Sequence, residues 1–375
     1  MRRPTDDLRI IQTRPLIPPA ILHEELPMTE YVSELVFSTR KAIADIVHGR
    51  DKRLLAIVGP CSIHDPSGAF AYATELKAIA DEVKAKVLVV MRAYFEKPRT
   101  NVGWKGFIND PDLDESCQIN KGLRLARKLL LDVNSLGLPT GSEFLDLQIP
   151  QQVADVTSWV AIGARTSESQ VHRELVSGLS MPVGFKNSTE GSLTSAVDAV
   201  QSARSQHWFP SVTKQGVGAI FQTTGNEDCH IILRGGSRTG PNFDSESVLR
   251  ACSLLEKRGL PARVMVDCSH GNSHKDHTKQ AEVIGEICRQ LSASPSLRCV
   301  VRGKGDRGGG DESARSTPDA QRCPILGVMI ESNLVAGRQD HVPGKDLVFG
   351  QSITDGCISI EETRRLLENL ASAVG

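Results

Sequence analysis

Short apolar runs alternate along the chain with longer segments in which apolar residues recur every three or four positions. Eight of these runs have the length and composition of buried strands: residues 53–59, 86–92, 138–144, 159–165, 181–187, 230–236, 262–269 and 325–332. A segment with helical periodicity follows each run, and the last one is 360–374. This alternation predicts an α/β fold with a parallel sheet. Eight units favour a closed (β/α)8 barrel, the TIM barrel, although alternation alone leaves a doubly wound sheet open.

Local signals indicate where two of the helices begin. Asp65 before Pro66 predicts the first helix after a strand, because Asp is a good N-cap and Pro fits the first turn. Asp112 with Glu115 resembles a capping box and predicts the start of the helix that carries Ile119.

Residues 1–50 precede the first unit, and we expect them to form an N-terminal arm and helix with an oligomeric or regulatory role. The helix is predicted from about Thr29 to Val47, with Val32, Leu35, Val36 and Ile43 on one apolar face. That face would pack against the bottom of the barrel or against a second subunit. Residues 51–375 would form the catalytic barrel.

Two segments interrupt the pattern of strands and helices. Residues 211–229, between units five and six, combine strand-forming residues with turn signals and predict an inserted β-hairpin. Residues 296–323 are rich in Gly, Arg and Ser, with almost no apolar residue after Val301. We expect a flexible polar insertion there, because such a segment cannot bury itself.

Composition narrows the function. The net charge of −1 gives no electrostatic case for binding nucleic acid or an acidic membrane. Nine scattered cysteines indicate reduced thiols. The proline-broken N-terminus does not resemble a signal peptide, and no run approaches the roughly 18–20 apolar residues of a membrane span. We therefore expect a cytoplasmic protein.

In a barrel of this kind, the carboxyl ends of the strands meet at one face, where the chemistry takes place. Six cations lie at or just beyond these ends: Arg92, Lys97, Arg99, Arg165, Lys186 and Arg234. Each alone is typical of a solvated surface, but six together would repel unless anions lie among them. Guanidinium forks combined with ammonium groups bind phosphates, and two subclusters make two phosphorylated substrates plausible.

The adjacent strands one, seven and eight present a thiol, an imidazole and two carboxylates, from Cys61, His270, Glu331 and Asp355. Such mixed ligands suit one divalent Mn, Fe, Co or Zn ion better than Mg or Ca alone. These four side chains come together only if the barrel closes. Without closure, Cys61 is an ordinary buried thiol and Glu331 a capping or ion-pairing residue.

The histidine-rich stretch "VMVDCSHGNSHKDH" (264–277) first suggests a local zinc-binding interaction module. Its spacing does not match a self-contained zinc motif, so we assign a ligand role to His270 alone. His274 and His277 are interpreted as a loop residue and a helix start. For His274, a contact with metal or substrate remains the alternative.

Several long motifs carry a family resemblance: "GPCSIHD" (59–65), "MRAYFEKPRTNVGWKGFINDPDLD" (91–114), "GARTSESQVHRELVSGLSMPVGFKN" (163–187), "HIILRGG" (230–236), "DCSHGNS" (267–273) and "SITDGC" (352–357). Together they resemble the class I, microbial-type, aromatic-amino-acid-regulated 3-deoxy-D-arabino-heptulosonate 7-phosphate (DAHP) synthases. The resemblance implies condensation of phosphoenolpyruvate with erythrose 4-phosphate and water to give DAHP and phosphate, the first step of the shikimate pathway.

The resemblance also implies roles for individual residues. Cys61, His270, Glu331 and Asp355 would be the metal ligands, and Lys97, His270 and Cys61 the catalytic groups. Arg92, Lys97, Arg165, Lys186 and Arg234 would contact phosphoenolpyruvate with Glu143 nearby, while Arg99 and Thr100 would hold the phosphate of erythrose 4-phosphate.

Feedback inhibition by an aromatic amino acid is likewise implied, in a homodimer or homotetramer. The matching positions are Asp6, Asp7, Pro150, Gln151, Leu179, Ser180, Phe209 and Ser211. Ordinary packing and capping is the alternative for each of them. Two other functions stay open: a non-catalytic paralogue that binds an aromatic amino acid, and a phosphoenolpyruvate-condensing synthase for another sugar phosphate, against which "KPRT" (97–100) argues.

Overall fold

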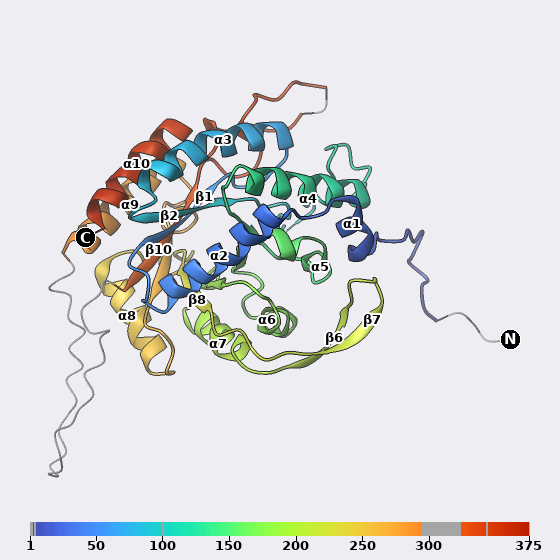
Figure 1. The fold of residues 1–375 in the computed structure, drawn as a ribbon, viewed down its shortest axis with the longest axis horizontal. Coiled ribbons are helices and arrows are strands. Elements are labelled where there is room, and N and C mark those ends of the chain that lie inside the picture. Colours follow the sequence, from blue (N-terminus) through green and yellow to red (C-terminus); the bar gives the residue numbers. More distant parts are fainter. Residues whose placement is uncertain (1–2, 4, 100, 294–323, 343, 375) are drawn as a thin grey trace, which may run out of the picture.

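Eight parallel strands close into a barrel, as the alternating pattern predicts (Figure 1). The structure is a computed structural model that describes residues 3, 5–99, 101–293, 324–342 and 344–374. Around the barrel the strands follow the order β1-β10-β9-β8-β5-β4-β3-β2. Helices cover its outside, which is the arrangement of a (β/α)8 TIM barrel.

The barrel strands are β1 (Leu54–Gly59), β2 (Val87–Arg92), β3 (Thr140–Glu143), β4 (Trp159–Ile162), β5 (Val183–Lys186), β8 (Cys229–Leu233), β9 (Val264–Asp267) and β10 (Ile325–Glu331). The helices are α1 (Pro19–Glu25), α2 (Glu30–Val47), α3 (Pro66–Val83), α4 (Ile119–Ser135), α5 (Pro150–Val153), α6 (Gln170–Ser177), α7 (Thr194–Ala203), α8 (Ser245–Glu256), α9 (Gln280–Ser292) and α10 (Ile360–Ala373). Two short 3₁₀ helices are η1 (Ala154–Val156) and η2 (His277–Lys279).

Alternate residues of most barrel strands face two different cores. In β1, Leu54, Ala56 and Val58 belong to the large core shared with the surrounding helices. Leu55 and Ile57 point into the barrel, where they join a separate cluster. Because both faces are covered, the strand is apolar throughout, as the continuous runs in the sequence indicated.

Helix α2 closes one end of the barrel interior. Its residues Ile43, Ile46 and Val47 belong to the same cluster as Leu55 of β1 and Trp159 of β4. Of the two partners predicted for this helix, these residues therefore pack against the barrel. The opposite end stays open for the loops that follow the strands.

One of the two predicted helix starts is confirmed and the other is wrong. Asp65 caps α3, since its carboxylate accepts hydrogen bonds from the backbone N–H groups of Ser67 and Gly68. The helix predicted at Asp112 begins only at Ile119. Glu115 has a left-handed φ of 63°, and Asp112 pairs with Lys121, so these residues form turns instead of a cap.

A hairpin outside the barrel consists of the antiparallel strands β6 (Trp208–Val212) and β7 (Gly218–Gln222). It begins three residues earlier than the predicted 211–229, and β8 already starts at Cys229. Strands β11 (Val335–Arg338) and β12 (Gln351–Ser352) form a second small sheet near the carboxyl end. The predicted insertion at 296–323 lies outside the described residues.

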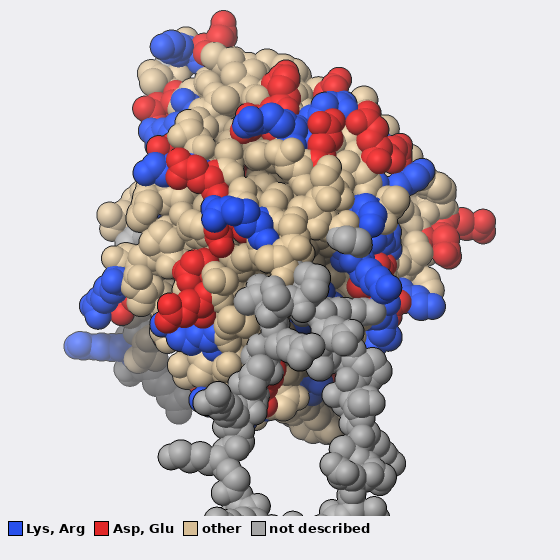
Figure 2. All heavy atoms as spheres, turned by 90° about the vertical axis from the view of Figure 1, so that its left-hand side faces the viewer, with Lys and Arg blue, Asp and Glu red and all other residues tan. Residues whose placement is uncertain are grey.

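Acidic and basic side chains are interspersed on the face of the molecule that Figure 2 shows. That distribution agrees with the near-zero net charge of the whole chain. None of the described helices combines the length and the apolar character needed to cross a bilayer.

Candidate active site

A cavity of about 750 Å³ opens among the loops that follow the carboxyl ends of the barrel strands. All six predicted cations line it: Arg92, Lys97, Arg99, Arg165, Lys186 and Arg234. The wall also includes Cys61, Glu143, His270, Glu331 and Asp355. These groups come from positions up to 294 residues apart, and barrel closure brings them together. Thr100 lies outside the described residues.

Three of the four predicted metal ligands form a compact group. The ligand atoms of Cys61, Glu331 and Asp355 all lie within 4.8 Å of one another, and no other such group occurs in the described part of the chain. His270 is not part of this group, but its Nε2 is 4.0 Å from Glu331 Oε1. Sulfur, nitrogen and carboxylate oxygen therefore face a common space, and this combination suits a borderline divalent metal.

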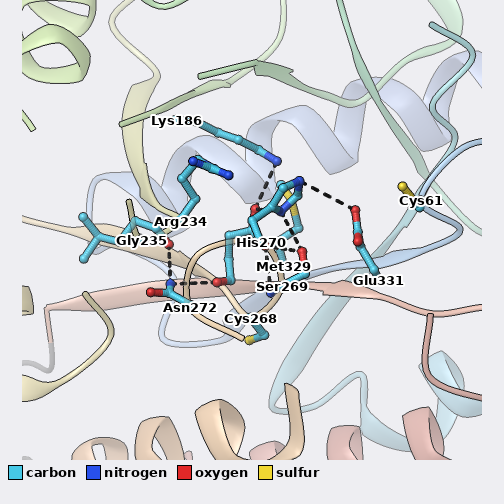
Figure 3. Close-up of polar contacts among 12 residues, drawn as sticks. Cys61, Lys186, Arg234, Gly235, Cys268, Ser269, His270, Asn272, Met329 and Glu331 are labelled. Atoms are coloured by element: carbon cyan, nitrogen blue, oxygen red, sulfur yellow. Dashed lines mark hydrogen bonds and ion pairs between the residues drawn. The ribbon is translucent and has the colours of Figure 1, made fainter. Parts of the chain in front are cut away.

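The imidazole of His270 is held in one orientation by its neighbours (Figure 3). Ser269 Oγ donates to Asp267 Oδ1 at 2.8 Å and lies 2.7 Å from His270 Nδ1. Because the hydroxyl has one proton and gives it to Asp267, it accepts from Nδ1–H. That tautomer leaves the lone pair of Nε2 on the side of Glu331, as a metal ligand requires.

Asp267 is fully buried at the end of β9, and sequence reasoning did not assign it a role. Its Oδ2 lies 3.0 Å from Lys186 Nζ and 3.0 Å from His270 Nδ1. Burial acts to raise the pKa of Asp267, but His270 and Lys186 together hold that pKa well below its usual range. The carboxylate is therefore charged, and it orients one predicted ligand and one predicted substrate contact.

Lys97 lies between two members of the metal group. Its Nζ is 3.0 Å from Cys61 Sγ and 2.8 Å from Asp355 Oδ2. Burial acts to lower the pKa of Lys97, but Cys61 and Asp355 raise it above its ordinary value, so this amine stays charged. Burial and Glu331 raise the pKa of Cys61 to about 11. The thiol must therefore lose a proton before it can bind a metal.

Other cations of the cavity also lie close to charged side chains. Arg92 is buried, with Nη2 3.2 Å from Glu331 Oε1 and its guanidinium 3.8 Å from the centre of the Tyr94 ring. Burial lowers the pKa of Arg234, Asp267 raises it and the positive charge of Arg165 lowers it further. Guanidinium groups whose positive charges repel one another in this way favour a bound anion between them.

Glu96, His274 and His277 are among the residues of the cavity wall that were not predicted as site residues. Glu96 is buried beside Lys97, accepts hydrogen bonds from the backbone N–H groups of Leu145 and Asp146, and has its pKa raised by burial to about 8. His274 and His277 also line the cavity. His277 begins η2 as predicted, and His274 lies exposed in the preceding loop.

A second cavity, of about 330 Å³, lies between α5, α6 and the β6–β7 hairpin. Six of the predicted regulatory residues line it: Pro150, Gln151, Leu179, Ser180, Phe209 and Ser211. Arg40, Asp155 and Lys214 add charged groups to its wall. Asp6 and Asp7 lie exposed in the N-terminal arm and are not among the lining residues of this cavity.

Comparisons with known proteins agree with this architecture. The model of the DAHP synthetase I family matches residues 32–368. The Phe-sensitive phospho-2-dehydro-3-deoxyheptonate aldolase of Escherichia coli K12 is 51% identical over 374 residues, which cover 100% of this chain and 99% of that enzyme. The Trp-sensitive enzyme of the same strain is 47% identical over 370 residues, with coverage of 99% and 98%.

A solved structure of phospho-2-dehydro-3-deoxyheptonate aldolase from Francisella tularensis SCHU S4 superimposes with a TM-score of 0.88. It is 51% identical in sequence, and the match covers 97% of this chain and 98% of that one. The family model spans most of the chain, and the relatives match it over nearly their whole length. The chain therefore belongs to the DAHP synthetase I family, whose members are transferases of the aldolase type.

Proposed function

We propose that this protein condenses phosphoenolpyruvate with erythrose 4-phosphate and water, giving DAHP and inorganic phosphate as the first step of the shikimate pathway. The observation that carries the proposal is one cavity whose wall brings the six predicted cations together with a thiol, an imidazole and two carboxylates. Two phosphorylated substrates, one of which also carries a carboxylate, need this much positive charge, and the same cavity offers ligands for a metal.

The metal proposal rests on the donor set. Cys61, Glu331 and Asp355 would hold one Mn, Fe, Co or Zn ion, and His270 would add its Nε2 lone pair. When bound, such an ion supplies Lewis acidity that polarises the aldehyde oxygen of erythrose 4-phosphate.

The protein's own residues would bind and orient the substrates. Arg165, Lys186 and Arg234 would hold phosphoenolpyruvate, with Arg92 beneath it and Glu143 beside it, while Arg99 would grip the phosphate of erythrose 4-phosphate. Carbon three of the enol would then lie near the aldehyde carbon, and proximity lowers the barrier to bond formation. Water would add at carbon two and phosphate would leave, and the ammonium of Lys97, which lines the same cavity, would deliver a proton to the new alkoxide.

We propose that an aromatic amino acid binds the second cavity and inhibits the enzyme. Phe209, Leu179 and Pro150 offer apolar contacts to a ring, and Lys214 and Asp155 offer charges for a carboxylate and an ammonium group. Asp6 and Asp7 would complete the site from the arm of a neighbouring copy. The two Escherichia coli relatives are named for sensitivity to Phe and to Trp, which supports an effector of this class.

We further propose a homodimer or homotetramer in the cytoplasm. Trp208 and Ile220, on the outer face of the hairpin, are 62% and 76% exposed, and Phe37 of α2 is 68% exposed. Large apolar side chains exposed to this extent on neighbouring elements are typical of surfaces that pair with another subunit. The mixed surface charge offers no patch for nucleic acid on the face shown in Figure 2.

The substrate assignment is tested by giving the purified protein phosphoenolpyruvate and Mn²⁺ with either erythrose 4-phosphate or a five-carbon aldose phosphate. We expect consumption of phosphoenolpyruvate with the four-carbon sugar and at most slow turnover with the larger one. Arg99→Ala should raise the KM for erythrose 4-phosphate about 100-fold and leave the KM for phosphoenolpyruvate nearly unchanged. A preference for the five-carbon sugar would refute the assignment.

A further inference from the structure

Hydrogen bonds hold the turn that carries Asp355 at its two ends. Thr354 N donates to Ser352 Oγ at 3.1 Å, and Gly337 and Cys357 exchange two backbone hydrogen bonds of 2.8 and 3.1 Å. Asp355 itself is 49% exposed, whereas Glu331 is 3% exposed. Asp355 is thus the least enclosed member of the metal group, and its orientation depends on what supports the tip of the turn.

The imidazole of His277 lies against this tip. A Cβ atom placed on Gly356 would lie 2.8 Å from His277 Nδ1 and 3.2 Å from its Cγ, which is closer than packed carbon atoms allow. Gly356 is not among the glycines with positive φ, so its backbone would accept alanine. The ring of His277 alone excludes a side chain there.

His277 is itself held in place by the start of α9. Asp276 Oδ1 accepts hydrogen bonds from Thr278 N and Oγ1 at 3.0 and 2.7 Å, which fixes η2. Gln280, three residues after His277, donates to Glu331 O and accepts from Glu331 N, both at 2.9 Å. The short helical segment from His277 to Gln280 therefore forms hydrogen bonds with Glu331 directly. Through the ring of His277 it also contacts Gly356, the residue after Asp355.

We propose that His277 is a positioning residue that supports Asp355 for metal binding by packing its ring on Gly356. The inference rests on the proposed metal site, and it assigns to His277 neither a metal bond nor a proton transfer. It gives the last histidine of "VMVDCSHGNSHKDH" a role through contact with a loop almost eighty positions further along the chain.

A double-mutant cycle tests the contact. His277→Ala should weaken Mn²⁺ binding about 10-fold, since residues that orient a ligand typically contribute 10- to 100-fold. Gly356→Ala should weaken it by a similar factor, because the new Cβ must displace the ring or the turn. In the double variant the nearest remaining atom is the Cβ at position 277, at 3.5 Å, an ordinary contact. The double variant should therefore lose about 10-fold, not the 100-fold that independent effects would give.

Mn²⁺ affinity is measured by calorimetry on the full-length protein, and thermal unfolding of the same four metal-free proteins reports the packing contact. Gly285→Ala is the matched control, because a Cβ at that glycine of α9 meets no atom within 4 Å. Additive losses of Mn²⁺ affinity would overturn the inference, and so would coupling seen in unfolding alone. Asp355→Asn separates the two hypotheses: if it leaves Mn²⁺ affinity unchanged, the proposed metal site fails, and with it the role of His277.

Discussion

Replacing Asp267 with Asn removes the one buried carboxylate that contacts both Lys186 and His270 among the described residues, without changing the size of the side chain. Two losses follow from the structure. The Lys186 ammonium, 5% exposed, loses the partner 3.0 Å away, and His270 loses the charge that stabilises its orientation. The variant therefore tests whether Asp267 holds Lys186 and His270 in the positions that the site requires.

The two losses have different magnitudes. Removing one partner of a buried ion pair costs about 3–5 kcal/mol, and we expect a loss in this range. Disturbing the orientation of His270 should weaken Mn²⁺ binding about 10- to 100-fold. The pKa of Asp267 is depressed in the folded protein, so its contribution to stability is present at pH 7 and is lost as the pH falls below about 4.

Urea unfolding at pH 7 and at progressively lower pH measures the loss of folding stability, and calorimetry measures the loss of Mn²⁺ affinity. Asp244→Asn is the matched control, because this exposed carboxylate caps α8 through Ser247 N and Asn caps almost as well. The reasoning is refuted if Asp267→Asn unfolds at the same urea concentration as the unchanged protein and binds Mn²⁺ as tightly.

Three further predictions concern the proton of Cys61, the charge of Glu96 and the second cavity. With a thiol pKa of about 11, Cys61 must release a proton when it binds a metal. Calorimetry should therefore show Mn²⁺ affinity rising about tenfold per pH unit between pH 7 and 9, and a Cys61→Ser variant should lose this pH dependence. The pKa of Glu96 is raised to about 8 in the folded state, so urea unfolding should show the unchanged protein losing stability relative to Glu96→Gln as the pH rises from 5 to 9; parallel curves would contradict this. Ser180→Phe should fill the second cavity and abolish inhibition by Phe or Trp while kcat changes less than about twofold, and full retention of inhibition would place the effector elsewhere.

The sequence predicted the barrel because most strands are covered on both faces and therefore appear as unbroken apolar runs, as β1 and β2 do. It also predicted the groups in the large cavity, since the carboxyl ends of parallel strands must meet at one face. Cys61 and Asp355 are 294 positions apart, yet their side chains lie 3.4 Å apart for this reason.

Contacts that depend on three-dimensional detail could not be predicted in this way. Asp267 appears in the sequence as one residue near the end of the predicted strand 262–269, and its role depends on Lys186 of β5. Glu96 interacts with backbone N–H groups, which carry no sequence signal. The capping pattern at Asp112 failed because the long loop before α4 is held by Asp110, which accepts from Glu115 N.

The central claim is metal-dependent condensation of two phosphorylated substrates in the large cavity, and one measurement tests it most directly. The loss of phosphoenolpyruvate absorbance is followed with erythrose 4-phosphate and Mn²⁺, before and after thorough treatment with a chelator. The account predicts turnover that stops when the metal is removed and returns when Mn²⁺ is added back. Absence of turnover with metal, or turnover unchanged after its removal, would contradict it.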